Sequence, residues 1–160
     1  MKYVVLTGRF LYSLIFLITI VNHLSPGAIS LASSAGIPAA NYLVPVSGIL
    51  AVLGAFSIMV GYKAKLGARL IVIFLVPVTV IMHPFWTGAD LFQTEIQLAM
   101  FAKNISLLGA ALIISYFGAG PLSFDAEYKF GIVKSKRIGR AQTISRLEPD
   151  FIRERLKKYT

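Results

Sequence analysis

Apolar residues gather in four long segments that short polar stretches separate. The segments run from about 4 to 24, 42 to 61, 66 to 83 and 96 to 117, and each is close to the ~20 residues that a helix needs to cross a bilayer. Few residues separate the second segment from the third, so these two are predicted to form an antiparallel hairpin. The pattern predicts an all-α membrane protein, with a four-transmembrane-helix bundle over 1–125 and a tail over 126–160.

The composition agrees with this class. Of the 160 residues, 56% are hydrophobic and 14% are charged, whereas a soluble domain of this size needs more polar surface. The chain has no cysteine, which excludes disulfides, Cys-ligated zinc, iron–sulfur clusters and thiol catalysis. The length of the first segment and the arginine inside it favour an uncleaved first helix over a signal peptide.

The second segment carries small residues at helical spacing. Such residues let two helices approach closely in a membrane, so this segment is predicted to pack through them. They are Ser47, Gly48, Ala51, Gly54, Ala55 and Gly61.

The basic residues predict the orientation of the bundle. The connections over 25–41 and 83–95 contain neither lysine nor arginine, and the positive charge lies mainly at the start of the first segment, at the hairpin turn and in the tail. Because lysine and arginine stay on the cytoplasmic side, both termini are predicted to be cytoplasmic, and the two connections without lysine or arginine are predicted to lie outside. The residues that carry this prediction before the tail are Lys2, Arg9, Lys63, Lys65 and Arg69.

Polar side chains from three of the segments are predicted to meet in the outer part of the bundle. A rise of about 1.5 Å per residue places the histidines about 27–28 Å from the inner ends of their helices and the lysine about 22 Å. Ionisable groups at such depths are costly and tend to face the bundle interior. The predicted ligand-binding set is Asn22, His23, His83, Trp86, Lys103 and Asn104.

This outer cluster has several interpretations. Its imidazoles, amine and amides suit the carbonyl or hydroxyl oxygens of a polar-headed hydrophobic ligand such as a quinone, or a lipid headgroup. Placement at the bilayer edge, where Trp, His and Lys are common, is the simpler alternative. Two histidines without close spacing do not define a haem or metal site, so no metal is predicted.

Two predictions concern the inner side. Arg9 lies inside the first segment and needs an acceptor, so a structural ion pair between Arg9 and Asp125 is predicted to tie the C-terminal segment to the first helix. The tail is basic and ends in an amphipathic stretch with Phe151, Ile152 and Leu156 on one side. Such a tail is predicted to contact anionic lipid or a cytoplasmic partner, and no nucleic acid.

Short motifs along residues 5–125 resemble the DoxX family. They appear in order on the four-segment pattern, with His23 where the family has a lysine and Gly109-Ala110 where it has paired glycines. The motifs are Gly8-Arg9-Phe10-Leu11 with Asn22-His23-Leu24, the end of the second segment from Gly54 to Lys65, His83-Pro84-Phe85-Trp86, Phe101 to Gly109, and Pro121 to Asp125.

The DoxX resemblance implies a multi-pass protein of the bacterial or archaeal cytoplasmic membrane, associated with quinone-linked oxidoreductase systems. Because the chain offers no redox centre of its own, the resemblance makes it at most a quinone-interacting subunit or accessory component, with quinone as the ligand and no intrinsic cofactor. One alternative is a structural or scaffold subunit with a protein partner or a second copy. Another is a small binder or transporter of lipids or hydrophobic metabolites.

Overall fold

The computed structural model describes residues 2–88, 90–128, 138, 154, 155 and 157. Its main helices are α1 (Lys2–His23), α2 (Pro26–Ser34), α3 (Ala40–Val60), α4 (Ala64–Met82), the short 3-10 helix η1 (Phe85–Thr87) and α5 (Leu91–Phe117). Four helical spans are long and apolar enough to cross a membrane: α1, α3, α4 continued through η1, and α5. The predicted all-α fold with four transmembrane helices is confirmed. Met1–Asp125 and Ala126–Thr160 form separate compact units.

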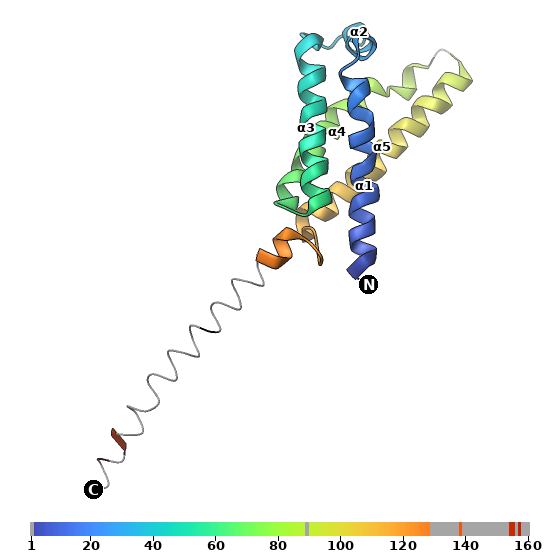
Figure 1. Ribbon diagram of the computed structural model, residues 1–160. Coiled ribbons are helices and arrows are strands. Elements are labelled where there is room, and N and C mark those ends of the chain that lie inside the picture. Colours follow the sequence, from blue (N-terminus) through green and yellow to red (C-terminus); the bar gives the residue numbers. More distant parts are fainter. Residues whose placement is uncertain (1, 89, 129–137, 139–153, 156, 158–160) are drawn as a thin grey trace. The chain divides into compact units, whose positions relative to one another are not determined.

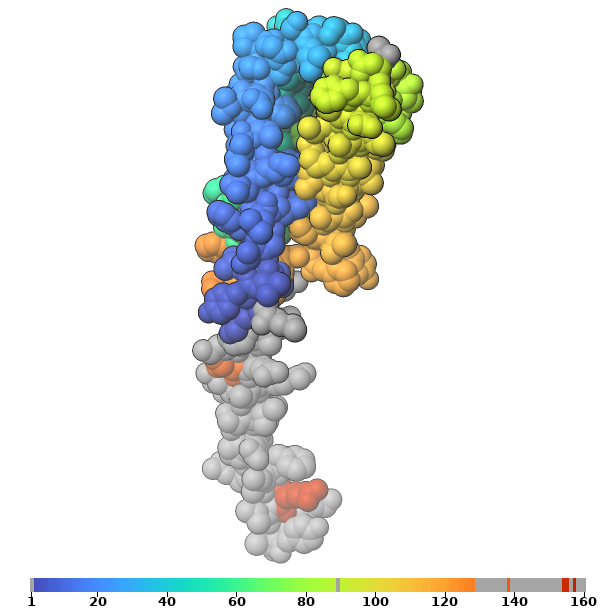
Figure 2. All heavy atoms as spheres, turned by 90° about the vertical axis from the view of Figure 1, so that its right-hand side faces the viewer, coloured from blue at the N-terminus to red at the C-terminus, as the bar shows by residue number. Residues whose placement is uncertain are grey.

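The helices of the first unit are arranged around α3 and α4. These two form the predicted antiparallel hairpin, with a tight turn at residues 61–63; α1 packs against α3, and α5 packs against α4 (Figure 1). The Tyr12 hydroxyl of α1 donates to the Leu107 carbonyl of α5 at 3.1 Å, and Figure 2 looks onto the face where α1 and α5 both reach the surface. We call the end that holds the 61–63 turn the turn end, and the opposite end the α2 end.

The connection over 25–41, expected to be a loop, contains α2. Ser25 caps this helix by accepting from the Ala28 backbone N–H at 3.2 Å, and Pro26 occupies the first turn. The chain then reverses at Gly36, whose φ of +83° suits glycine. Serine followed by proline is a helix-start signal that the hydropathy pattern does not contain.

The fourth spanning helix begins earlier than predicted, at Leu91 rather than near Ile96. The Asp90 carboxylate caps it by accepting from the Gln93 backbone N–H at 2.8 Å, and the Thr94 hydroxyl donates to the Asp90 carbonyl at 2.8 Å. The polar residues after Asp90 resemble a loop by hydropathy, yet they form the first turn of α5 because the cap satisfies an otherwise unpaired N–H group.

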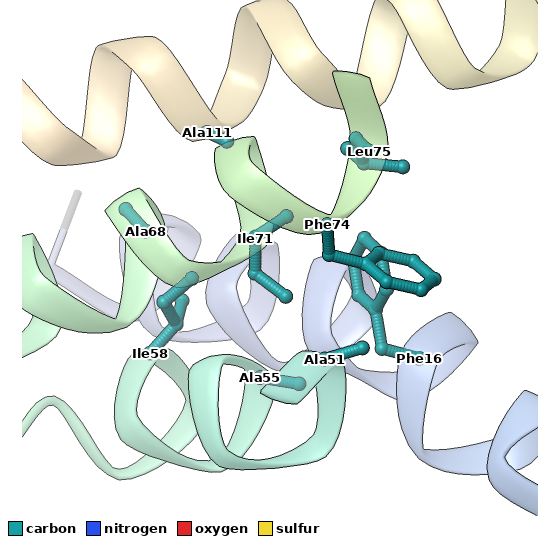
Figure 3. Packing of buried hydrophobic residues seen from close by; sticks show 9 residues of the cluster. All are labelled: Phe16, Ala51, Ala55, Ile58, Ala68, Ile71, Phe74, Leu75 and Ala111. Carbon is teal, nitrogen blue, oxygen red and sulfur yellow. The ribbon is translucent and has the colours of Figure 1, made fainter. Parts of the chain in front are cut away.

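The core lies between the hairpin and the two flanking helices, as Figure 3 shows. Of the small residues predicted to pack, Gly48, Ala51, Gly54 and Ala55 are buried on α3, whereas Ser47 is half-buried. The small residues let larger side chains of α1 and α4 fill the centre. By contrast, Leu53 and Phe56 of α3 are each 59% exposed and form part of the apolar outer surface that suits lipid contact. The buried cluster contains Phe16, Ala51, Ala55, Ile58, Ala68, Ile71, Phe74, Leu75 and Ala111.

Glycines set the separation of α3 and α4. A Cβ added to Gly54 would lie 2.8 Å from the Gly67 carbonyl oxygen, and a Cβ added to Gly67 would lie 2.7 Å from the Gly54 carbonyl oxygen. These neighbours are backbone atoms, so they cannot rotate away. The two helices therefore touch through their backbones, and side chains longer than hydrogen are excluded at both positions.

We expect Gly54→Ala to lower the free energy of unfolding by about 1–3 kcal/mol, because the added methyl group forces the hairpin apart. The matched control is Gly109→Ala in α5, where an added Cβ meets no atom within 4 Å and where alanine favours the helix. SDS-induced unfolding in mixed micelles measures both variants. Equal stability of the two variants would contradict the backbone contact.

Candidate functional site

His23, the last residue of α1, lies against α3 and α4 at the α2 end. Its Nδ1 is 3.1 Å from the Thr19 carbonyl oxygen, and its ring centroid is 5.5 Å from that of Phe74. Gly48 permits this position, since a Cβ at Gly48 would lie 2.7 Å from the His23 Cβ. The imidazole is thus held by the last turn of α1 on one side and by two neighbouring helices on the others.

A cavity of about 300 Å³ lies beside His23, a volume at the lower end of the range for small-molecule sites. Its walls come from the end of α1, from α2, from the start of α3 and from the end of α4. Leu31 and Leu43 remain 61% and 49% exposed, so the cavity opens to the protein surface. The residues that line it are His23, Ala28, Leu31, Ala32, Ile37, Leu43, Val44, Ser47, Pro77, Val78, Ile81 and Met82.

The chemistry of this cavity suits binding. Only His23 and Ser47 among the lining residues carry a nitrogen or oxygen in the side chain, and they belong to different helices. Each of these side chains is close to a backbone carbonyl of its own helix: His23 Nδ1 lies 3.1 Å from the Thr19 oxygen, and the Ser47 hydroxyl donates to Val44 at 2.8 Å. In the described part of the chain, no three His, Cys, Asp or Glu side chains group so that they could hold a metal. Shape and dispersion contacts with an apolar group are what the walls provide.

His83 and Trp86 belong to a different part of the α2 end. The Nδ1 atom of His83 lies 3.0 Å from Oε1 of Gln97 on α5. The Phe85 ring centroid is 5.1 Å from that of Trp86 and 5.2 Å from that of Phe101. These contacts fasten η1 to α5, and Trp86 is still 58% exposed, as suits an aromatic residue at a membrane interface.

The other predicted ligand residues also lie away from the cavity. Asn22 and Lys103 are exposed, the Lys103 Nζ being 3.5 Å from the Met100 sulfur, and Asn104 is buried on α5. Of the predicted set, His23 alone lines the cavity. The rise per residue gave the height of each side chain but not its direction, and α5 runs obliquely away from α1 toward the α2 end (Figure 1).

At the turn end, residues 118–125 form a clasp that connects the helices. Arg9 donates through Nη2 to the Leu122 carbonyl at 2.6 Å. The Asp125 carboxylate accepts from the backbone N–H groups of Lys63 and Ala64 at 2.8 and 3.0 Å, and the Asp125 N–H donates to the Gly61 carbonyl at 2.9 Å.

The clasp changes how the predicted Arg9–Asp125 connection is made. Among the described residues, Arg9 and Asp125 each bond to backbone groups and not to each other. Asp125 acts as the missing N-cap of α4, because Lys63 at the cap position has φ +49° and provides no side-chain cap. Gly61 allows the approach of Arg9, since its φ is +76° and a Cβ there would collide with the Arg9 Nη1 atom.

Comparison with known proteins identifies the family. A model of the SURF4 family matches residues 1–130. The yeast (Saccharomyces cerevisiae) ER-derived vesicles protein ERV29 is 27% identical over 85 residues, which are 51% of this chain and 26% of that protein. The chain therefore spans about a quarter of the length of the curated relative that it matches. No solved structure matches the chain.

These matches overturn the DoxX interpretation. The predicted quinone-linked oxidoreductase subunit is wrong, because the family is SURF4 and the relative is a protein of ER-derived vesicles. The motifs that suggested DoxX are short and mark features shared by many four-helix membrane proteins: small residues at helix contacts, a glycine after a helix, and aromatic residues at a bilayer edge. The prediction of a multi-pass membrane protein remains supported. The prediction of a bacterial or archaeal cytoplasmic membrane rested on the DoxX resemblance and loses its basis with it.

The predicted amphipathic stretch with Phe151, Ile152 and Leu156 lies outside the described residues. Its contact with anionic lipid or a cytoplasmic partner stays a prediction.

We expect Asp125→Ala to lower the free energy of unfolding by about 1–2 kcal/mol, because two N–H groups at the start of α4 lose their acceptor. Glu127→Ala is the matched control: it removes the same charge from an exposed side chain two residues further along the chain. Thermal unfolding in detergent measures both. A loss of similar size in the control would show that charge, and not the cap, is responsible.

Proposed function

The chain belongs to the SURF4 family, and from that premise we propose that it is a membrane receptor that binds an apolar group of a membrane-borne molecule without altering it. The cavity beside His23 carries this proposal. It is bounded by residues of four helices, its walls are almost wholly hydrocarbon, and it opens at Leu31 and Leu43. A ligand dissolved in the bilayer reaches such an opening without crossing water.

The shape of the site supports specific binding over general lipid contact. Lipid tails already solvate the outer surface of the helices, so a lipid chain gains little by moving from one apolar surface to another. A concave site adds contacts on several sides of the bound group, and each well-placed pair of atoms contributes about 0.1–0.2 kcal/mol. Enclosure by α2 therefore distinguishes this site from the rest of the membrane-facing surface.

The name of the yeast relative places that protein in vesicles derived from the endoplasmic reticulum. A receptor that retains an apolar group inside the membrane fits such a setting, because the loaded protein and its ligand travel together when the membrane moves. We propose the same kind of role for this chain, with the bound molecule as the passenger. A structural role with no ligand is the competing proposal, and a site that binds nothing would favour it.

The orientation of the bundle is a further part of the proposal. Lys63 and Lys65 lie at the turn end with the N-terminus and the clasp, whereas 25–41 and 83–95 at the α2 end contain no lysine or arginine. Under the positive-inside rule the turn end faces the cytoplasm. The cavity then opens in the half of the membrane away from the cytoplasm.

Photolabelling tests ligand binding. A dodecyl chain with a diazirine in mid-chain is expected to label peptides that contain cavity residues, and Ala28→Phe is expected to weaken this labelling about tenfold, equivalent to 1.4 kcal/mol of binding, because the new ring fills the cavity. Ala102→Phe on the exposed side of α5 is the control. Labelling spread evenly over the helices, or unaffected by Ala28→Phe, would reject the receptor proposal.

Single-cysteine labelling tests the orientation. The chain has no cysteine, so Thr87→Cys at the α2 end and Tyr62→Cys at the turn end each introduce the only thiol. In sealed vesicles whose cytoplasmic face is outside, an impermeant maleimide is expected to label Tyr62→Cys directly and Thr87→Cys only after the membrane is opened. The reverse pattern would invert the proposed orientation.

A further inference from the structure

The hydrogen bonds at the cavity wall determine which polar group a ligand can present. This inference rests on the proposed ligand-binding function and concerns the chemistry of the ligand's head. His23 Nδ1 lies 3.1 Å from the Thr19 carbonyl oxygen. A carbonyl oxygen only accepts hydrogen bonds, so Nδ1 carries the hydrogen. In the neutral imidazole, Nε2 then has a lone pair and no hydrogen.

Ser47 offers the same kind of group. Its hydroxyl donates to the Val44 carbonyl at 2.8 Å, one turn back in α3. The single hydroxyl hydrogen is used there, and the remaining lone pair of Oγ can accept. Ser47 is the neighbour of Gly48, against which His23 packs at a separation that excludes a Cβ. The two residues thus come from neighbouring helices and both line the cavity.

No donor side chain accompanies them. Among the lining residues, Ser47 uses its hydrogen internally, His23 uses its Nδ1 hydrogen internally, and the others have carbon or sulfur side chains. We propose that the cavity binds a lipid-like alcohol: an apolar body whose hydroxyl group donates to His23 Nε2, with Ser47 Oγ as the second acceptor.

The same geometry disfavours ligands whose polar head group can accept a hydrogen bond but cannot donate one. An ether, ester or ketone oxygen placed at Nε2 faces a lone pair, and the oxygen of the ligand loses hydrogen bonds without gaining one. A mismatch of this kind lowers affinity by about tenfold or more. Quinone oxygens belong to this disfavoured class.

A matched pair of ligands tests the proposal. Full-length protein in nanodiscs is labelled with the dodecyl diazirine chain, and 1-dodecanol or dodecyl methyl ether competes for the site. We expect dodecanol to compete about tenfold better than the ether. His23→Phe keeps an aromatic ring beside Phe74 but has no nitrogen, and it is expected to make the two competitors equal.

Further variants keep the test decisive if His23→Phe does not fold. Ser47→Ala removes the second acceptor and is expected to reduce the preference for dodecanol. Ser115→Ala is the matched control, because the Ser115 hydroxyl also donates one turn back, to Leu112 at 2.8 Å, but lies on α5 away from the cavity. It is expected to keep the full preference.

The outcomes separate this inference from the proposed function. If dodecanol and the ether displace the dodecyl diazirine probe equally from the natural protein, the cavity binds apolar groups but the alcohol proposal is overturned. The alcohol proposal also fails if the preference survives in both His23→Phe and Ser47→Ala. If neither competitor displaces the diazirine probe, or if the probe does not label cavity residues, both the alcohol proposal and the receptor proposal are overturned.

Discussion

The backbone contact between α3 and α4 is the constraint on which the rest of the bundle depends. Gly54 and Gly67 bring the two helices so close that no side chain fits between them; α1 packs against α3, and α5 packs against α4. In a membrane there is little hydrophobic drive between helices, so close packing and internal hydrogen bonds must supply the association energy. A wider hairpin would separate the core residues of α3 and α4, and α1 and α5 would lose their common support.

At the turn end, internal hydrogen bonds of polar groups hold the helices together. The short turn between α3 and α4 leaves the first N–H groups of α4 without a local cap, and the Asp125 carboxylate satisfies two of them from about 60 residues away. Arg9 in turn binds the Leu122 carbonyl. Unsatisfied backbone groups are costly away from water, so the clasp holds α1, the hairpin and the end of α5 in one arrangement.

The α2 end is built differently, and the cavity results from that difference. At this end α5 diverges from α1, and α2 lies beside the ends of α1 and α3 (Figure 1). The cavity is the space that remains among α1, α2, α3 and α4. Gly48 admits the His23 ring, and the carbonyl of Thr19 fixes its Nδ1 hydrogen. The place of His23 at the edge of an apolar cavity is therefore a product of helix packing.

Hydropathy and charge determined the class of this protein without help from the structure. Four apolar segments of this length form helices in a bilayer, because every backbone N–H and C=O must be paired within the segment. The small residues of α3 indicated its packing face, because they let a neighbouring helix approach closely. The early start of α5 and the presence of α2 depended on Asp90 and Ser25 caps that hydropathy does not record. The candidate site was predicted from depth along each helix, and only His23 lines the cavity, since depth leaves the direction of a side chain undetermined. That direction follows from how α1, α3, α4 and α5 rotate and tilt against one another, so only the tertiary structure could separate His23 from His83 and Lys103.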